Sequence, residues 1–196
     1  QYLLTFLIML AVGLITGQLT AGFKYQAHVA TRREQRMRAL YEMSRDLSGA
    51  LLAEQIAEIG ERFLASEFAA RTALALVDEN DQLLPPLPSA RPVSAFDHGV
   101  ARWAFDHGEC AGAGTDTLPG SPVLYLPLKA PMRLRGVLAV ELPDAGRLLI
   151  PEQRRLLDTF SSLLAIAIER VHYVEVARDT TVQMESERLR NSLLSA

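Results

Sequence analysis

The first 23 residues, QYLLTFLIMLAVGLITGQLTAGF, contain no charged side chain. As a helix rising about 1.5 Å per residue, this stretch would reach roughly 34 Å, more than the hydrocarbon core of a bilayer, which is about 30 Å thick. A cleaved signal peptide would instead carry basic residues before a shorter apolar core. The sequence therefore predicts a transmembrane helix over residues 1–23.

The basic residues follow the apolar stretch rather than precede it. Residues 24–50 carry six Lys or Arg against three acidic residues, and residues 51–196 are acidic, for a total charge of −3. By the positive-inside rule, the chain after residue 23 is expected to be cytoplasmic. The overall charge gives no reason to expect nucleic-acid binding, and a single cysteine, Cys110, excludes an internal disulfide.

Two patterns near the predicted span favour pairing with a second copy of the chain. Gly13 and Gly17 form a GxxxG motif that lets another helix approach closely, although glycine is also ordinary in membrane helices. A repeat at 3-4-3-4 spacing then follows, at Met37, Leu40, Ser44, Leu47 and Leu51. We expect a juxtamembrane signalling helix within residues 24–50, paired in a dimer; the alternative is one amphipathic helix packed on its own domain.

The middle of the chain alternates between helical and extended patterns. We predict a helix over LLAEQIAEIGERFLASEF, a strand over residues 72–78 and, at best, a short edge strand over the proline-containing QLLPPL. AFDHGVARWAFDHG predicts a short helix that Gly108 ends, with Phe96 and Trp103 facing the core. VLYLPLKA and RLRGVLAVEL predict a hairpin, in which Gly136 indicates a bulge or a close approach of backbones.

The last segment predicts one long helix that begins at Pro151, a favoured residue for a first helical turn. An apolar seam of 4-3-4-3 spacing runs along it, at Phe160, Leu164, Ala167, Val171 and Val174. The seam fails between residues 178 and 188 and returns four residues out of phase, a stutter that locally unwinds a coiled coil.

These segments, in this order, resemble a GAF domain: a first helix, a core of antiparallel strands, a variable ligand-facing segment and a final helix. The most family-like stretch is IPEQRRLLDTFSSLLAIAIER. Together with the apolar first segment, REQRMRALYEMSRDL and AGAGTDTLPGSP, it resembles the membrane-bound sensor histidine kinases of bacteria that respond to potassium limitation or osmotic stress. The resemblance covers essentially the whole chain.

The resemblance implies an α+β fold, with a GAF-like antiparallel sheet flanked by helices, between a transmembrane helix and a long coiled-coil-type helix. It assigns residues 51–172 to the GAF domain and residues 173–196 to the start of the kinase dimerisation helix. The whole protein would be a homodimer in the bacterial inner (plasma) membrane, in contact with lipid, with the GAF domain in the cytoplasm. The number of further membrane spans is left open.

The resemblance also implies the chemistry of the whole protein. A kinase domain beyond this chain would use ATP to phosphorylate a histidine that lies beyond Ala196, and the phosphoryl group would pass to an aspartate of a response regulator that controls potassium uptake. None of the four histidines present matches the acceptor motif: His28, His98, His107 and His172. We therefore expect no catalytic residue and no cofactor in this segment.

The loop AGAGTDTLPG, residues 111–120, is the candidate ligand site. Its small residues would let a ligand approach the main chain beside Thr115, Asp116 and Thr117. Its glycines lack the spacing of a phosphate-binding loop, whereas its carbonyl and hydroxyl oxygens suit K⁺ or another small ligand. The alternative is a tight structural loop that binds nothing.

Other groupings of polar residues give weaker signals. Asp106, His107, Glu109 and Cys110 lie close in sequence but fit no zinc-ligand spacing, so we expect no metal site. Paired carboxylates for acid–base chemistry would have to come from Asp97, Asp106 and Asp116, with nothing in the sequence to position them. Two other functions stay open: the regulatory segment of a cyclase or other output enzyme, and a structural spacer without a ligand.

Overall fold

A computed structural model describes residues 37–144, 146 and 150–194. The predicted transmembrane helix, residues 1–23, lies outside them. Of the helices within the described ranges, none combines the length and the apolar character that crossing a bilayer requires. The chain divides into two compact units, Gln1–Glu42 and Met43–Ala196, and the contacts described below all lie within the second.

Four antiparallel strands form one sheet in the order β1-β4-β3-β2. They are β1 (Arg71–Leu76), β2 (Ala111–Gly112), β3 (Leu124–Lys129) and β4 (Leu134–Glu141). The pairing of β3 with β4 confirms the predicted hairpin. The stretch QLLPPL forms no regular strand: it makes an isolated bridge between Val77 and Leu83, and only the N–H groups of Leu84 and Leu87 donate to β1, because the two prolines between them have no N–H group.

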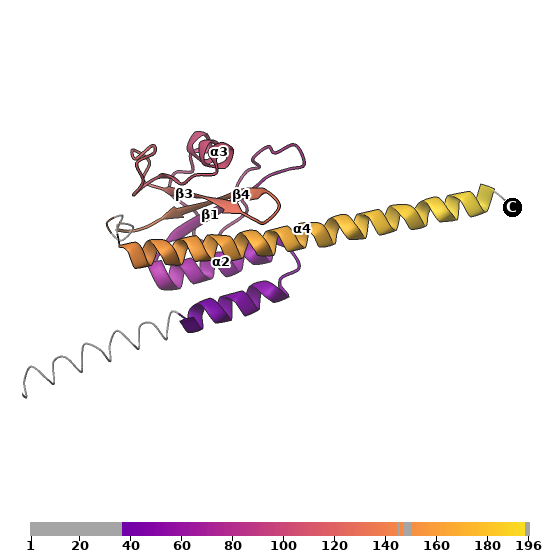
Figure 1. Ribbon diagram of the computed structural model, residues 1–196, viewed down its shortest axis with the longest axis horizontal. Coiled ribbons are helices and arrows are strands. Elements are labelled where there is room, and N and C mark those ends of the chain that lie inside the picture. The colour runs from indigo at the N-terminus through magenta and orange to yellow at the C-terminus, as the bar shows by residue number, and fades with distance from the viewer. Residues whose placement is uncertain (1–36, 145, 147–149, 195–196) are drawn as a thin grey trace, which may run out of the picture. The chain divides into compact units, whose positions relative to one another are not determined.

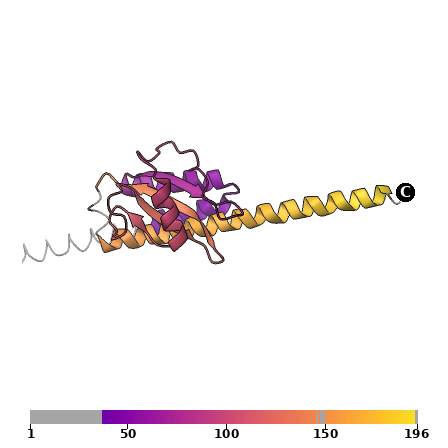
Figure 2. The same cartoon turned by 90° about the horizontal axis from the view of Figure 1, so that it is seen from above.

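Helices cover both faces of this sheet (Figures 1 and 2). Helices α2 (Ala53–Phe68) and α4 (Pro151–Leu194) pack on one face, and α3 (His98–His107) packs on the other. The result is an α+β fold of the predicted class. Its apolar core has one layer on each side of the sheet.

The ends of the helices follow the local sequence signals. The Asp97 carboxylate accepts hydrogen bonds from the backbone N–H groups of Gly99 and Val100, which caps the start of α3. Gly108 ends the same helix in a left-handed conformation with φ of 63°, as predicted. Helix α4 begins at Pro151, also as predicted.

The core between α2, α4 and the sheet is aromatic and closely packed. The rings of Phe63 and Phe160 stack with centroids 4.9 Å apart and planes 8° from parallel. Gly60 brings the backbone of α2 against α4: a Cβ atom at this position would lie 3.4 Å from side-chain atoms of Leu164 and Phe160. Helices α2 and α4 are therefore held at a short separation.

Gly136 lies at an irregularity of the β3–β4 ladder, where the register shifts between Pro127 and Lys129. Its φ is 152°, and a Cβ atom would lie 2.2 Å from the carbonyl oxygen of Ala75 on β1. The structure confirms both parts of the prediction, a bulge and a close approach of backbones.

Residues 37–49 are helical and precede α2. Met43 and Leu47 are buried, whereas Leu51, assigned to the seam from the sequence, lies beyond the end of this helix and is 72% exposed. The predicted 3-4-3-4 seam is therefore wrong at its last position. Met43 and Leu47, four residues apart, pack on the domain of their own chain, and the predicted pairing of this helix in a dimer stays a prediction.

Helix α4 changes character along its length. Among the side chains described, Val171 is its last buried one, and the apolar side chains described after that point are exposed: Tyr173, Val174, Val176 and Met184. The predicted stutter between residues 178 and 188 falls mostly on side chains that lie outside the described part, so it stays a prediction.

Candidate functional site

A groove of about 820 Å³ opens beside the loop that the sequence singled out. The residues after α3, the loop 113–117, strand β3 and the first turns of α4 form its walls. Its polar lining comes from Glu109, Cys110, Thr115, Asp116, Thr117, Lys129, Arg154, Asp158, Ser161 and Ser162. All three predicted ligand-binding residues therefore lie in one groove.

The loop that borders this groove is held by its own hydrogen bonds. The backbone N–H of Gly112 donates to the carbonyl of Thr117 at 2.8 Å, and the N–H of Ala113 donates to the carbonyl of Val123 at 3.1 Å. The Thr115 hydroxyl lies 2.8 and 2.7 Å from the carbonyl oxygens of Gly112 and Thr117. A hydroxyl has only one proton to donate. The Thr115 hydroxyl therefore uses its proton in a hydrogen bond within the loop.

The three predicted residues consequently differ in what they offer a ligand. Within the described ranges, the side chains of Asp116 and Thr117 make no hydrogen bond, whereas the Thr115 hydroxyl already has two partners within the loop. Asp116 is exposed and Thr117 is half-buried. The arrangement leaves one carboxylate and one hydroxyl available, on a loop that is already rigid.

Cys110 lines the groove together with the charged residues Lys129, Arg154 and Asp158. Burial raises the pKa of its thiol above the usual 9.0, and the charge of Asp158 acts in the same direction. The Arg154 guanidinium, by its charge and its hydrogen-bonding capacity toward the sulfur, and the Lys129 ammonium lower the pKa. The net direction is upward, so the thiol is protonated at neutral pH and is a poor nucleophile.

The groups that the sequence placed near each other around residue 107 do not converge on a metal. Asp106 pairs with Arg102 at 2.9 Å, and the His107 ring stacks on Trp103 with centroids 4.1 Å apart. Within the described chain, no three His, Cys, Asp or Glu side chains gather where an ion could bind. Of the other two acids considered for acid–base chemistry, Asp97 caps α3 and lies outside the groove, whereas Asp116 lines it.

Side chains fill the opposite face of the sheet, beneath α3. Tyr125 is buried there, and its phenolic oxygen accepts a hydrogen bond of 2.7 Å from the backbone N–H of Asp97. Burial raises the pKa of Tyr125 above its usual 10.0, against the effect of this hydrogen bond. Phe96 meets the Tyr125 ring edge-on, and Phe96 and Trp103 both pack against the core, as predicted.

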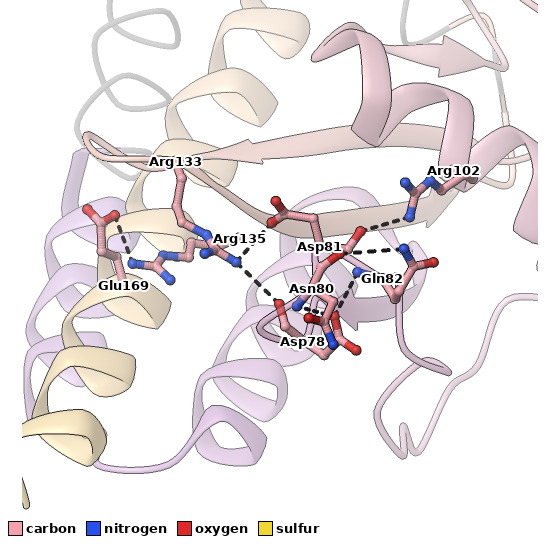
Figure 3. Close-up of polar contacts among 8 residues, drawn as sticks. All are labelled: Asp78, Asn80, Asp81, Gln82, Arg102, Arg133, Arg135 and Glu169. Carbon is pink, nitrogen blue, oxygen red and sulfur yellow. Dashed lines mark hydrogen bonds and ion pairs between the residues drawn. The ribbon is translucent and has the colours of Figure 1, made fainter. Parts of the chain in front are cut away.

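A polar network joins α3, the turn after β1 and the β3–β4 hairpin (Figure 3). Asp78 organises the turn, since its carboxylate accepts from the backbone N–H groups of Asn80 and Gln82. Arg102 of α3 donates to the carbonyl of Asp81 at 2.8 Å, and Arg133 of the hairpin pairs with the Asp81 carboxylate at 3.0 Å.

Arg135, two residues further along the hairpin, forms a buried ion pair with Glu169 of α4. The two charged atoms lie 3.3 Å apart, and the side chains are only 5% and 9% exposed (Figure 3). Glu169 also accepts from the backbone N–H of Met132, and the Arg135 guanidinium lies 5.2 Å from the centroid of the Tyr173 ring. The hairpin is thereby fixed to α4 near Val171, beyond which the described apolar side chains of the helix are exposed.

The sequence analysis did not single out Arg135 and Glu169, although a signal was present. Arg135 interrupts the apolar strand RLRGVLAVEL, and Glu169 interrupts the apolar run LLAIAIERV. Charged residues are rarely buried unless they are paired, so two opposite charges inside two apolar segments indicate a pair. What the sequence could not show is which strand faces which turn of the helix.

Residues 52–170 match the GAF domain family. This match covers more than half of the chain, which therefore belongs to that family. Over its whole length, the chain is similar to Sensor protein KdpD of Escherichia coli K12, with 47% identity across 196 residues, and to Sensor protein KdpD of Clostridium acetobutylicum, with 29% identity across 202 residues. The chain spans 22% of the length of each of these relatives.

The similarity extends to a solved structure, the GAF domain of the potassium sensor histidine kinase KdpD from E. coli. The match has 44% identity and a TM-score of 0.65, and it covers 71% of this chain and 96% of that structure. A free methionine-R-sulfoxide reductase from Neisseria meningitidis matches at 18% identity and a TM-score of 0.51, over 71% of this chain and 91% of that one. At that identity the likeness concerns the fold alone.

Proposed function

We propose that this chain is the sensory and signal-transmitting segment of a membrane-bound sensor histidine kinase that regulates potassium uptake. The observation that carries the proposal is the 47% identity to Sensor protein KdpD along all 196 residues. In the whole protein, a kinase domain uses ATP to phosphorylate a histidine beyond Ala196. The phosphoryl group then passes to an aspartate of a response regulator.

The architecture of the described part supports transmission rather than catalysis. The groove thiol is protonated at neutral pH, and two of the three acids considered for acid–base chemistry, Asp97 and Asp106, serve as a cap and an ion-pair partner. Helix α4 is built into the GAF core up to Val171 and then exposes apolar side chains, as a helix that packs against a second copy would. We therefore propose a homodimer in the bacterial inner membrane, with residues 1–23 as a transmembrane helix and the GAF domain in the cytoplasm.

The proposed kinase activity is tested on the full-length protein in membrane vesicles. We expect labelled ATP to phosphorylate it on a histidine, and a purified response regulator to remove the label. Labelling should change with the potassium concentration and disappear when the acceptor histidine is replaced by glutamine. Vesicles that take up no label in any condition would contradict the proposal, as would a sequence after Ala196 without an acceptor motif.

We further propose that the groove beside Asp116 and Thr117 is the ligand site of the GAF domain, with K⁺ or a small polar molecule as ligand. The support is the groove itself and the carboxylate and hydroxyl that its rigid loop leaves without partners in the described chain. Thr115 contributes by closing the loop. Carbonyl, hydroxyl and carboxylate oxygens are the ligands that hard monovalent cations prefer.

The single cysteine of the chain is a natural reporter for this groove. We expect K⁺, but not Na⁺ at the same ionic strength, to slow the alkylation of Cys110 in the 196-residue chain in detergent micelles. Asp116→Asn should abolish that protection, whereas Asp144→Asn, a change outside the groove, should preserve it. Equal rates in both salts would remove K⁺ as the ligand, and a panel of small polar metabolites would then be screened in the same assay.

A further inference from the structure

Arg170 of α4 contacts the end of the 37–49 helix. Its Nη2 donates to the carbonyl oxygens of Leu47 and Ala50 at 2.7 and 2.6 Å, and its Nη1 donates to the carbonyl oxygen of Ser48. The last carbonyl groups of a helix have no partner inside the helix, and a cation beside them interacts favourably with the helix dipole. One side chain therefore joins the end of the 37–49 helix to α4.

The neighbouring residue, Glu169, joins α4 to a different element. Its Oε1 accepts from Arg135 Nη2 and from the backbone N–H of Met132, both at 3.3 Å. These two residues belong to the β3–β4 hairpin, which Arg133 in turn connects to the turn after β1 (Figure 3). Glu169 thus adds a polar contact to the apolar packing of α4 on the sheet and, through the hairpin, connects α4 with the network that reaches α3.

Consecutive residues of an α-helix point about 100° apart around its axis. A helix held by one side chain can turn about that contact, whereas contacts in two directions fix its rotation. Glu169 and Arg170 provide such contacts at one level of α4, directly before Val171, the last of its described side chains that is buried. The side chains described after this level are exposed, from Tyr173 to Arg178.

We propose that Glu169 and Arg170 together set the rotation of α4, so that a displacement of either the 37–49 helix or the β3–β4 hairpin turns the segment after Val171. The 37–49 helix can then act on α4 directly through Arg170, without passing through the sheet, while the GAF core acts through Glu169. The inference rests on the proposed function only in treating the segment after Val171 as the output of the domain.

Hydrogen exchange of the 196-residue chain in detergent micelles tests the physical part of this inference. We expect Arg170→Met to speed exchange in residues 43–50, and Glu169→Gln to speed it in residues 130–135. Both should also speed exchange in residues 172–178, by about tenfold, because a hydrogen bond to a charged group stabilises by at least the 1.4 kcal/mol that a tenfold change represents.

A matched control is Arg155→Met, an exposed arginine of the same helix whose side chain makes no hydrogen bond or ion pair in the described chain. It should leave all three regions as in the unmodified protein. If each of the first two substitutions affects only its own partner element and leaves residues 172–178 unchanged, the two contacts are local and the inference is wrong.

Rotation itself is measured by disulfide cross-linking in the full-length protein. Single cysteines placed in turn from residue 172 to 178, in a Cys110→Ala background, should cross-link between copies with maxima three or four residues apart. Arg170→Met should move these maxima, and unmoved maxima would overturn the inference. If no position cross-links even without Arg170→Met, the homodimer of the proposed function fails, and the exchange pattern alone then supports or overturns the role of the two residues.

Discussion

Arg135 and Glu169 form an ion pair in which both charged side chains are almost completely buried, at 5% and 9% exposure. Removal of one partner from such a pair leaves an unpaired charge in the interior, at a cost of about 3–5 kcal/mol. We therefore expect Glu169→Leu or Arg135→Met to lower the free energy of unfolding by that amount. Urea titration followed by the fluorescence of Trp103, the single tryptophan, measures the change.

The double variant Arg135→Met/Glu169→Leu distinguishes the cost of leaving a buried charge unpaired from the cost of changing the packing around it. Apolar replacement of both partners of a buried ion pair is often neutral or stabilising, so the double variant should recover most of the loss. Arg45→Met, which removes the exposed pair with Asp46, should change the stability by no more than about 1 kcal/mol. A double variant as unstable as the sum of the single variants would show that packing, rather than charge, explains the loss.

Gly136 is predicted to tolerate no side chain. In Gly136→Ala, the added Cβ would lie 2.2 Å from the Ala75 carbonyl oxygen, so β1 and β4 must separate or the bulge must change its backbone angles. Overpacking and backbone strain each cost about 1–3 kcal/mol, and we expect a loss of about 3 kcal/mol or more in the same urea titration.

Gly120→Ala is the control for this substitution, because a Cβ atom there meets nothing within 4 Å. It should change the stability by less than about 0.5 kcal/mol. An alanine at position 136 that proves equally harmless would contradict the close approach of β1 and β4 at this bulge.

Local sequence signals were sufficient to predict the α3 helix, the β3–β4 hairpin, the bulge at Gly136 and the start of α4. These features depend on local chemistry: a glycine cap, a proline at a first turn, alternation along two strands. The sequence also placed Thr115, Asp116 and Thr117 on a candidate ligand loop, because small residues between regular elements indicate a loop where a backbone is accessible, and the structure puts that loop beside a groove.

The contacts of α4 could not be predicted in the same way. Arg170 bonds to carbonyl groups about 120 positions earlier in the chain, and Glu169 bonds to a strand more than 30 positions away. Backbone carbonyls carry no sequence identity, so nothing in the residues near Ser48 indicates an arginine partner. Long-range polar pairing of this kind depends on the relative placement of elements, which local patterns do not encode.

Glu141 should make the stability of the domain depend on pH in the acidic range. Its carboxylate accepts from the hydroxyl and the backbone N–H of Ser94 at 2.6 and 2.7 Å, and these hydrogen bonds lower its pKa below the usual 4.5. A carboxyl group with a lowered pKa in the folded state stabilises that state above its unfolded pKa. The contribution disappears as the pH falls through the folded value.

The test compares Glu141→Gln with the unmodified chain by thermal unfolding at a series of pH values. The stability difference between them should be largest near neutral pH and shrink as the pH falls below about 4.5. Ser94→Ala should reproduce part of this effect, since it removes the largest cause of the shift. Ser162→Ala, whose hydroxyl donates only to the Asp158 carbonyl of its own helix, should leave the pH profile unchanged. A stability difference that stays constant with pH would contradict the argument.

The charged side chains of the groove should shift the pKa of the Cys110 thiol, the cations downward and Asp158 upward. Burial raises its pKa above 9.0, and Arg154 is the strongest of the groups that lower it. Arg154→Met, which keeps the bulk of the side chain, should therefore raise the pKa further and slow alkylation at a fixed pH. Asp158→Asn should lower the pKa, because the Asp158 charge raises it, and Lys129→Met should raise the pKa by less than Arg154→Met does.

The measurement is the rate of alkylation by iodoacetamide across pH, in the native chain and in urea. Its midpoint reports the pKa of the thiol, whereas its plateau reports access to the sulfur, so the two effects are separated in one experiment. The native midpoint should lie above the midpoint in urea. If Arg154→Met and Asp158→Asn move the native midpoint in the same direction, the substitutions change burial rather than charge, and the electrostatic description of the groove is wrong.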